Sequence, residues 1–294
     1  MDATHGLLIS LLAVVATFTA LTMLSPCVAR VADEPAANEL LLGDVLLDDV
    51  HRDGPPCPTD RGYAGVRIAE RRVNSIEAMT STPTCFAESD FMLTADDHLV
   101  ATHDAAMGGD CGDVNQQTLE GVRRCRLSGG LRVATLDDFL AVPLTEWYVD
   151  LKSNLVAATD AEILHSVEVA VRSITRRGRE RGAVLLVYQV TPAVVDVLRD
   201  NGIRAGMKGY PDSRRSAKAM VRVARRHGFE LVCIRISFVD KRMLAYSRAR
   251  GVGQLSWELG ERTPRQWGRL ADRGLWGLLT TRGKIPRAQR AIQS

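Results

Sequence analysis

Short apolar segments alternate with helical patterns over most of the chain, and this alternation limits the possible folds more than any other feature. Residues 159–177, for example, place Ile163, Val167, Val171 and Ile174 on one face of a helix. Strands that alternate with helices form a parallel sheet. The expected strands are Val45–His51, Phe86–Phe91, Trp147–Lys152, Ala183–Gln189, Gly202–Lys208, Leu231–Ser237, Gly253–Glu258 and Leu275–Thr280.

The amino-terminal segment has a different character, because residues 6–24 are almost wholly apolar. Cys27-Val28-Ala29 offers small residues for cleavage, so residues 1–29 read as a secretory signal peptide. The apolar run is also close to the ~20 residues that span a bilayer, which makes an uncleaved membrane anchor the alternative. We therefore expect a secreted or otherwise extracytoplasmic protein, or one anchored by residues 6–24.

The remaining length fits one domain. After a short linker at residues 30–42, residues 43–294 come close to the ~250 residues of a (β/α)8 barrel. We predict an α/β chain with a single (β/α)8 (TIM) barrel. The net charge is only +3, and the arginines are spread over the predicted helices, so the sequence favours solvated helix faces over a nucleic-acid surface.

The cysteines agree with export. Cys233 lies within an apolar strand and is expected to be a buried free thiol. Cys57, Cys85, Cys111 and Cys125 lie in loops or at element ends, and four such cysteines in an exported chain favour two disulfides. Four cysteines allow three pairings. Closeness along the chain favours Cys111–Cys125 and Cys57–Cys85.

Acidic residues on two neighbouring strands point to a cation site. Side chains alternate along a strand, so Glu88 and Asp90 share one face, and Asp150 shares a face with Lys152 on the next strand. Carboxylates gathered without a sulfur ligand suit one divalent cation, Mg²⁺ or Ca²⁺. The active site of such a barrel lies where the strands end, so these residues are expected to form one cluster.

Four motifs occur in a fixed order: His51-Arg52, Glu88-Ser89-Asp90, His103-Asp104 and Asp150-Leu151-Lys152. In this order the chain resembles the glycerophosphodiester phosphodiesterase family. That family has a His-Arg pair after strand one, Glu-x-Asp on strand two, a His-Asp pair soon after, and Glu-x-Lys on strand three. The resemblance runs from about residue 45 to residue 282.

The resemblance implies a metal-dependent phosphodiesterase that cleaves glycerophosphodiesters to an alcohol and glycerol phosphate, with a glycerophosphodiester or lysophospholipid as small-molecule partner. Its catalytic residues would be His51 as acid and His103 as base. The implied metal ligands are Glu88, Asp90 and Asp150. Arg52 and Lys152 would bind the phosphate, and Trp257 would line the substrate pocket. No nucleic-acid partner is expected, and a membrane would be met only through the substrate or an uncleaved amino-terminal segment.

Departures from the family pattern keep two alternatives open. Val73 stands where the family has a glutamate, and Asp150 is shorter than the family's glutamate. The Asp150–Lys152 triplet and a disulfide-prone loop after His103 also resemble the sphingomyelinase D phospholipases, which share this barrel. The other alternative is a catalytically inactive barrel that binds phosphodiesters.

Overall fold

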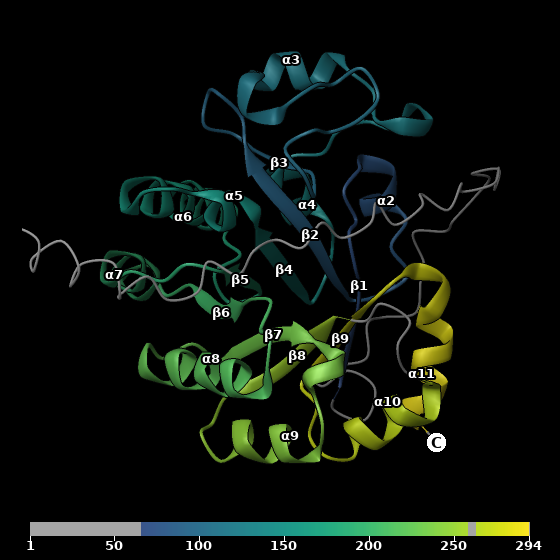
Figure 1. The fold of residues 1–294 in the computed structure, drawn as a ribbon. Helices are drawn as coiled ribbons and strands as arrows, with labels where there is room; N and C mark the ends of the chain where they lie inside the picture. Colours follow the sequence, from purple (N-terminus) through teal and green to yellow (C-terminus); the bar gives the residue numbers. More distant parts are fainter. Residues whose placement is uncertain (1–65, 258–262, 294) are drawn as a thin grey trace, which may run out of the picture. The chain divides into compact units, whose positions relative to one another are not determined.

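The computed structural model describes residues 66–257 and 263–293, all of which belong to one compact unit. Its centre is a closed barrel of eight parallel strands (Figure 1). The barrel strands are β1 (Arg67–Glu70), β2 (Phe86–Leu93), β4 (Glu146–Leu151), β5 (Ala183–Val187), β6 (Arg204–Lys208), β7 (Leu231–Arg235), β8 (Gly253–Trp257) and β9 (Gly277–Thr280). This confirms the predicted (β/α)8 barrel.

Helices surround the strands, as Figure 1 shows. They are α2 (Ile76–Thr80), α3 (Leu119–Arg124), α4 (Leu136–Ala141), α5 (Lys152–Val156), α6 (Asp160–Arg176), α7 (Pro192–Asp200), α8 (Arg214–Arg226), α9 (Lys241–Arg248), α10 (Pro264–Ala271) and α11 (Ile285–Gln293). Capping residues explain where several of them begin. Thr159 accepts a hydrogen bond from the Glu162 amide, and the Glu162 side chain returns the bond, so α6 starts with a complete capping box. No helix in the described residues is long and apolar enough to cross a membrane.

The first barrel strand is not the predicted one. β1 (Arg67–Glu70) pairs with both β2 and β9 and thereby closes the ring, so the prediction that Val45–His51 is the first strand was wrong. β1 has only four residues and carries a charged residue at each end, so its sequence lacks the apolar run that would predict a strand. Residues 45–51 lie outside the described part of the chain.

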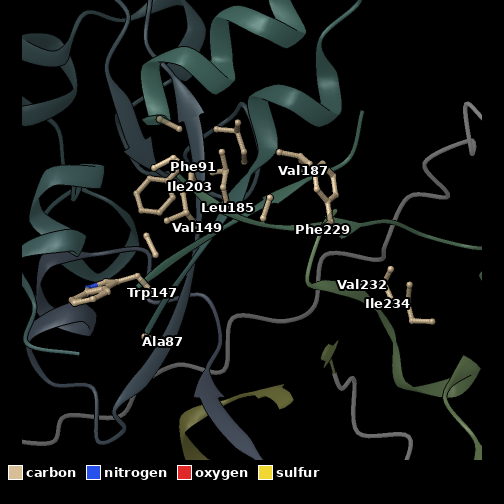
Figure 2. Packing of buried hydrophobic residues seen from close by; sticks show 14 of the residues in the cluster. Ala87, Phe91, Trp147, Val149, Leu185, Val187, Ile203, Phe229, Val232 and Ile234 are labelled. Carbon is tan, nitrogen blue, oxygen red and sulfur yellow. The ribbon is translucent and has the colours of Figure 1, made fainter. Parts of the chain in front are cut away.

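Alternating side chains build two hydrophobic layers. Val184 and Leu186 on β5 belong to a cluster made by strand residues inside the barrel. Leu185 and Val187 belong instead to the larger cluster between strands and helices (Figure 2). The same alternation turns Ala69 inward and Ile68 outward on β1. The direction of every side chain at a strand end follows from this pattern.

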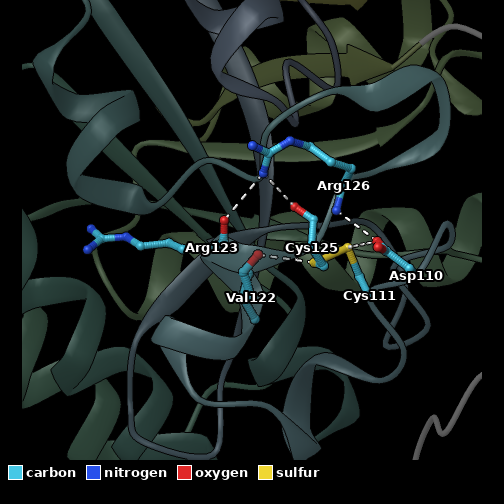
Figure 3. The surroundings of a disulfide bond; sticks show 6 residues. All are labelled: Asp110, Cys111, Val122, Arg123, Cys125 and Arg126. Atoms are coloured by element: carbon cyan, nitrogen blue, oxygen red, sulfur yellow. Dashed lines mark hydrogen bonds between the residues drawn. A yellow bond between two sulfur atoms is a disulfide. The ribbon is translucent and has the colours of Figure 1, made fainter.

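A separate lobe, residues 94–133, is inserted between β2 and α4. It contains β3 (Leu99–Ala101), which pairs antiparallel with β2, and it packs around a small hydrophobic cluster of its own. The predicted disulfide Cys111–Cys125 is present in this lobe (Figure 3). The Arg126 side chain donates to the carbonyls of Cys125 and Arg123, and its amide donates to Asp110.

The other cysteines agree with the prediction as far as they are described. Cys233 is a buried free thiol inside the barrel. Cys85 is also disulfide-bonded, and its predicted partner, Cys57, lies outside the described residues.

Candidate active site

Three buried carboxylates meet at the carboxyl end of the barrel. Glu88 and Asp90 project from β2, and Asp150 projects from β4, where it lies in register with Asp90. All three are at most 1% exposed. One oxygen of each lies within 4.8 Å of the others. We call Glu88, Asp90 and Asp150 the carboxylate cluster.

Two lysines neutralise most of this negative charge. Lys152, the first residue of α5, has its Nζ 3.4 Å from Asp90 Oδ1 and 3.3 Å from Asp150 Oδ2. Lys208, the last residue of β6, has its Nζ 2.9 Å from Glu88 Oε1 and also donates to Asp150. Lys152 was expected here, whereas Lys208 was not. Its strand was predicted, but a contact between residues 120 apart in sequence leaves no local pattern.

Burial and the paired charges act in opposite directions on these groups. Burial lowers the pKa of Lys208, but Asp150 and Glu88 outweigh it and hold that pKa well above its ordinary value. The pKa of Lys152 is raised in the same way, against its burial, by Asp150 and Asp90. Burial raises the pKa of Asp90, yet the lysines hold it below its ordinary value. Asp90 and the two lysines are therefore charged at neutral pH.

The turn after β1 fixes two of the carboxylates. The Arg72 amide donates to Glu88 Oε2 at 3.0 Å. Arg72 reaches this position with a φ of 59°, in the left-handed region that a residue with a side chain rarely adopts. Asn74 Nδ2 donates to Asp90 Oδ2 at 3.1 Å, and Asn74 Oδ1 accepts from the Asp90 amide at 3.1 Å.

His103 reaches the site from the start of the lobe. Its Nε2 lies 2.8 Å from Arg72 Nη2, and its Nδ1 lies 2.8 Å from Asp104 Oδ1. A guanidinium can only donate, so Nε2 is the acceptor and the ring proton is on Nδ1, facing Asp104. Asp104 thus orients the ring, and the Nε2 lone pair accepts from Arg72. His103 was among the residues predicted for this site.

Aromatic side chains lie at the carboxyl ends of β5, β6 and β8, next to Lys152. Tyr188 and Tyr210 stack with their centroids 5.9 Å apart, and Tyr210 meets Trp257 edge-on at 5.7 Å. Both tyrosine hydroxyls accept hydrogen bonds from Lys152 Nζ, at 3.0 and 3.3 Å. Arg71 and Arg235 lie over the Trp257 ring, each 5.9 Å from its centroid. Trp257 was expected in the pocket, whereas the tyrosines were missed although each follows the end of a strand.

The end of β1 differs from the family pattern. β1 ends at Glu70 and is followed by Arg71 and Arg72, so no histidine occupies this position. Glu70 accepts from Arg282 Nε at 2.7 Å. The predicted catalytic His51 and phosphate-binding Arg52 lie outside the described residues, and neither follows the first barrel strand.

The carboxylate cluster could hold a divalent cation. Its six donor atoms are all carboxylate oxygens, as Mg²⁺ and Ca²⁺ prefer. Asp150 Oδ1 is buried and has no hydrogen-bond partner, which suits an additional cation. The two ammonium groups on the same carboxylates are the feature that opposes such an ion.

No family model and no curated protein matches the chain. Solved structures do match, at 10–20% identity. A glycerophosphodiester phosphodiesterase from Parabacteroides distasonis is 14% identical, with a TM-score of 0.62 over 78% of this chain and 98% of the other. The Oleispira antarctica phosphodiesterase, solved with its product sn-glycerol-3-phosphate, is 14% identical, with a TM-score of 0.57 over 78% and 97%.

A third match, the glycerophosphodiester phosphodiesterase of Thermotoga maritima, is 14% identical, with a TM-score of 0.56 over 77% of this chain and 96% of the other. In each case the likeness covers nearly the whole of the other protein. The chain therefore has the barrel fold found in glycerophosphodiester phosphodiesterases.

Proposed function

We propose that the protein is a phosphoric diester hydrolase that cleaves glycerophosphodiesters to an alcohol and glycerol phosphate. The observation that carries the proposal is the convergence of the carboxylate cluster, Lys152 and an oriented His103 at the carboxyl end of the barrel. In this fold that end carries the active site. The Oleispira antarctica neighbour, with glycerol phosphate bound, supports the same substrate class.

Two cationic groups are suited to the phosphate. Lys152 is fixed between Asp90, Asp150 and two tyrosine hydroxyls, and the Arg72 guanidinium reaches the same end of the barrel through His103. A phosphodiester gains negative charge on its oxygens in the transition state, and fixed positive charge stabilises that state. We therefore assign phosphate binding to Lys152, and to Arg72 in addition to the proposed Arg52.

His103 is the proposed general base. Its Nε2 lone pair is available once Arg72 moves from it to the substrate phosphate, and Asp104 stabilises the imidazolium that forms. The proton would come from the substrate's own glycerol hydroxyl, which attacks phosphorus to give a cyclic phosphate. His51 remains the proposed acid for the leaving alcohol. Since it does not follow β1, that assignment rests on the His-Arg motif alone.

Glu88, Asp90 and Asp150 are the proposed ligands of one divalent cation, Mg²⁺ or Ca²⁺. When bound, such an ion would polarise a phosphate oxygen and help to orient the diester. Nothing in the donor set favours one of the two ions over the other, because both prefer oxygen.

A substrate panel tests this function. The purified protein is assayed for phosphodiester hydrolysis of glycerophosphocholine, glycerophosphoethanolamine, glycerophosphoinositol, lysophospholipid and sphingomyelin, with Asp90→Asn as the inactive control. Release of glycerol phosphate from a glycerophosphodiester is the expected result. Preferential cleavage of lysophospholipid or sphingomyelin would point to the sphingomyelinase D alternative.

A specific observation favours a binding role as the second candidate. The end of β1 carries no histidine, and Lys208 already satisfies two of the three carboxylates. A barrel that binds a phosphodiester without cleaving it needs neither a second proton-transfer group nor a metal ion. Binding of glycerophosphodiesters by calorimetry, with no hydrolysis over hours, would establish this role.

We also propose that the protein is exported. Residues 6–24 carry the signal, and the Cys111–Cys125 disulfide supports an oxidising compartment. Mass spectrometry of the mature protein is expected to give an amino terminus near Arg30. An intact Met1 in a membrane fraction would instead identify residues 6–24 as an anchor.

A further inference from the structure

Lys208 occupies an unusual position in the barrel. It comes from β6, yet its ammonium contacts carboxylates on β2 and β4. The residue is only 5% exposed, and the hydrogen bonds described for its ammonium go to Glu88 and Asp150. Both are proposed metal ligands, so the lysine lies where an added cation would have to bind.

Five of the six carboxylate oxygens already face a hydrogen-bond or ion-pair partner. Glu88 uses one oxygen for Lys208 and the other for the Arg72 amide. Asp90 faces Lys152 with one oxygen and Asn74 with the other. At Asp150, Oδ2 accepts from Lys208 and from the Tyr188 hydroxyl, while Oδ1 has no hydrogen-bond partner.

A divalent cation needs several oxygen ligands at once. An ion that used Glu88 Oε1 and Asp150 Oδ2 would share both oxygens with the Lys208 ammonium. The ammonium groups are the partners that an incoming cation repels most strongly, because they carry the same sign of charge.

Lys208 and Lys152 differ in what else holds them. Lys152 also donates to the hydroxyls of Tyr188 and Tyr210. The Tyr188 hydroxyl is itself bonded to Asp150, whereas the described hydrogen bond of the Tyr210 hydroxyl would hold Lys152 even if Asp150 turned away. The described hydrogen bonds of Lys208 go only to the two carboxylates. Lys208 is therefore the cation that a metal ion would compete with directly.

Charge leads to the same conclusion. Three carboxylates and two ammonium groups leave one net negative charge in the cluster. A divalent ion would reverse that charge, whereas in the absence of Lys208 the same ion would bring the cluster to neutrality. Like charges repel strongly in a buried site.

We propose that Lys208 is an intramolecular cation that competes with a divalent metal ion for Glu88 and Asp150, and thereby sets a weak metal affinity. This inference rests on the proposed metal site, but it does not require that the protein hydrolyse anything. It makes metal binding conditional on displacement of one lysine.

The test is calorimetric titration of the full chain with Mg²⁺ and with Ca²⁺ alone, in the absence of substrate. Lys208→Met keeps most of the length of the side chain and removes its charge. We expect it to bind at least one of the two ions at least ~10-fold more tightly than the wild type, since a nearby repelling charge has gone. Lys208→Arg, which keeps the charge, should bind as weakly as the wild type. Lys241→Met, an exposed lysine of α9, is the matched control and should not change affinity.

A second measurement covers the case in which Lys208→Met folds poorly. The melting temperature of each variant is recorded with and without ~10 mM metal, because binding to the native state alone raises it. A metal-dependent rise for Lys208→Met that exceeds the rise for wild type supports the proposal. Adding Asp150→Asn to Lys208→Met should abolish the gain.

Equal affinities of wild type and Lys208→Met for both ions would overturn the inference, and so would tight metal binding by the wild type that Lys208→Met does not improve. Failure of hydrolysis is a separate result. If Lys208→Met gains affinity and no diester is cleaved, the inference stands and the proposed function falls.

Discussion

The two ends of the barrel carry buried charges in opposite arrangements. At the amino ends of the strands, Glu146 lies 2.7 Å from Arg67 and 2.8 Å from Arg204, and Arg204 also pairs with Glu230 at 2.9 Å. Arg67, Glu146, Arg204 and Glu230 form what we call the basal network, with two charges of each sign. At the carboxyl ends, the carboxylate cluster keeps one more negative charge than its two lysines cancel.

This difference in charge balance indicates that one end contributes to stability and the other to ligand binding. Glu146 of the basal network also accepts from the Tyr148 hydroxyl at 2.7 Å, and Arg67 covers the Trp276 ring at 4.0 Å. In the basal network, Arg67 Nε and Glu230 Oε1 have no hydrogen bond, but each lies within 2.9 Å of an opposite charge, and the network as a whole is balanced. The carboxylate cluster differs because its charges do not balance, and Asp150 Oδ1 is left without a hydrogen bond on that side of the barrel.

Metal removal should give the largest difference between the two ends, because it should affect activity at the carboxylate cluster and leave the stability of the basal network unchanged. If the carboxylate cluster works with a divalent ion, exhaustive chelation should abolish hydrolysis, and Mg²⁺ or Ca²⁺ should restore it. The basal network holds its own counter-charges, so the denaturation midpoint of the metal-free protein should stay within a few degrees of its original value. Undiminished turnover after chelation would show that the lysines alone serve the phosphate.

Loss of His103 should lower the rate and leave stability nearly unchanged. His103→Ala removes the proposed base, so kcat on a glycerophosphodiester should fall by about 10²–10⁴-fold. A nitrophenyl diester with a good leaving group should not rescue it, whereas it should partly rescue His51→Ala if His51 is the acid. His165→Ala is the control, because His165 pairs with Asp97 on the surface. Rescue in the opposite pattern would exchange the two roles.

The basal network should show the reverse behaviour. Glu146→Ala leaves Arg67 and Arg204 without their shared carboxylate, and it should lower the free energy of unfolding by about 3 kcal/mol, the low end for a broken buried pair. Activity per folded molecule should not change. In the exposed pair Glu120–Arg124, Glu120→Gln should change stability by less than about 1 kcal/mol. A loss of activity without a loss of stability in Glu146→Ala would mean that the two ends are coupled.

The smallest effect concerns pH. Burial raises the pKa of Glu230 above its ordinary value of 4.5, although Arg204 opposes the shift. Between 4.5 and the raised pKa, the native state therefore binds more protons at Glu230 than the unfolded state, so acidification through this window favours folding. Asp90 has the opposite sign, since its lowered pKa removes stability as the pH falls through that pKa.

Thermal melts of wild type and Glu230→Gln from pH 7 to pH 4.5 should show this sign. As the pH falls, the melting temperature of the wild type should rise relative to that of the variant. A constant difference between the two proteins would mean that Glu230 does not titrate differently in the folded state.

The barrel was predictable because most of its strands and helices carry regular apolar patterns. α6, for example, shows helical spacing and a capping box in its sequence. β1 was missed for a physical reason: its four residues are held mainly by pairing with β2 and β9, and this leaves little apolar signal.

The site was predictable where its residues follow each other on a strand or in a short motif. Glu88 and Asp90 share a strand face, and His103 precedes its partner Asp104. Lys208 could not be paired with Glu88 in the same way, because only closure of the barrel brings β6 opposite β2. Its place at the end of a predicted strand was the one available signal.

Arg72 shows how a single position can set stability against activity. Its left-handed backbone conformation stores about 1–3 kcal/mol of strain. Glycine would adopt the same φ freely and could still offer its amide to Glu88, so a selection for thermal stability alone would favour glycine. The guanidinium that holds His103 would then be lost. A search for stabilising substitutions should therefore leave this position unchanged.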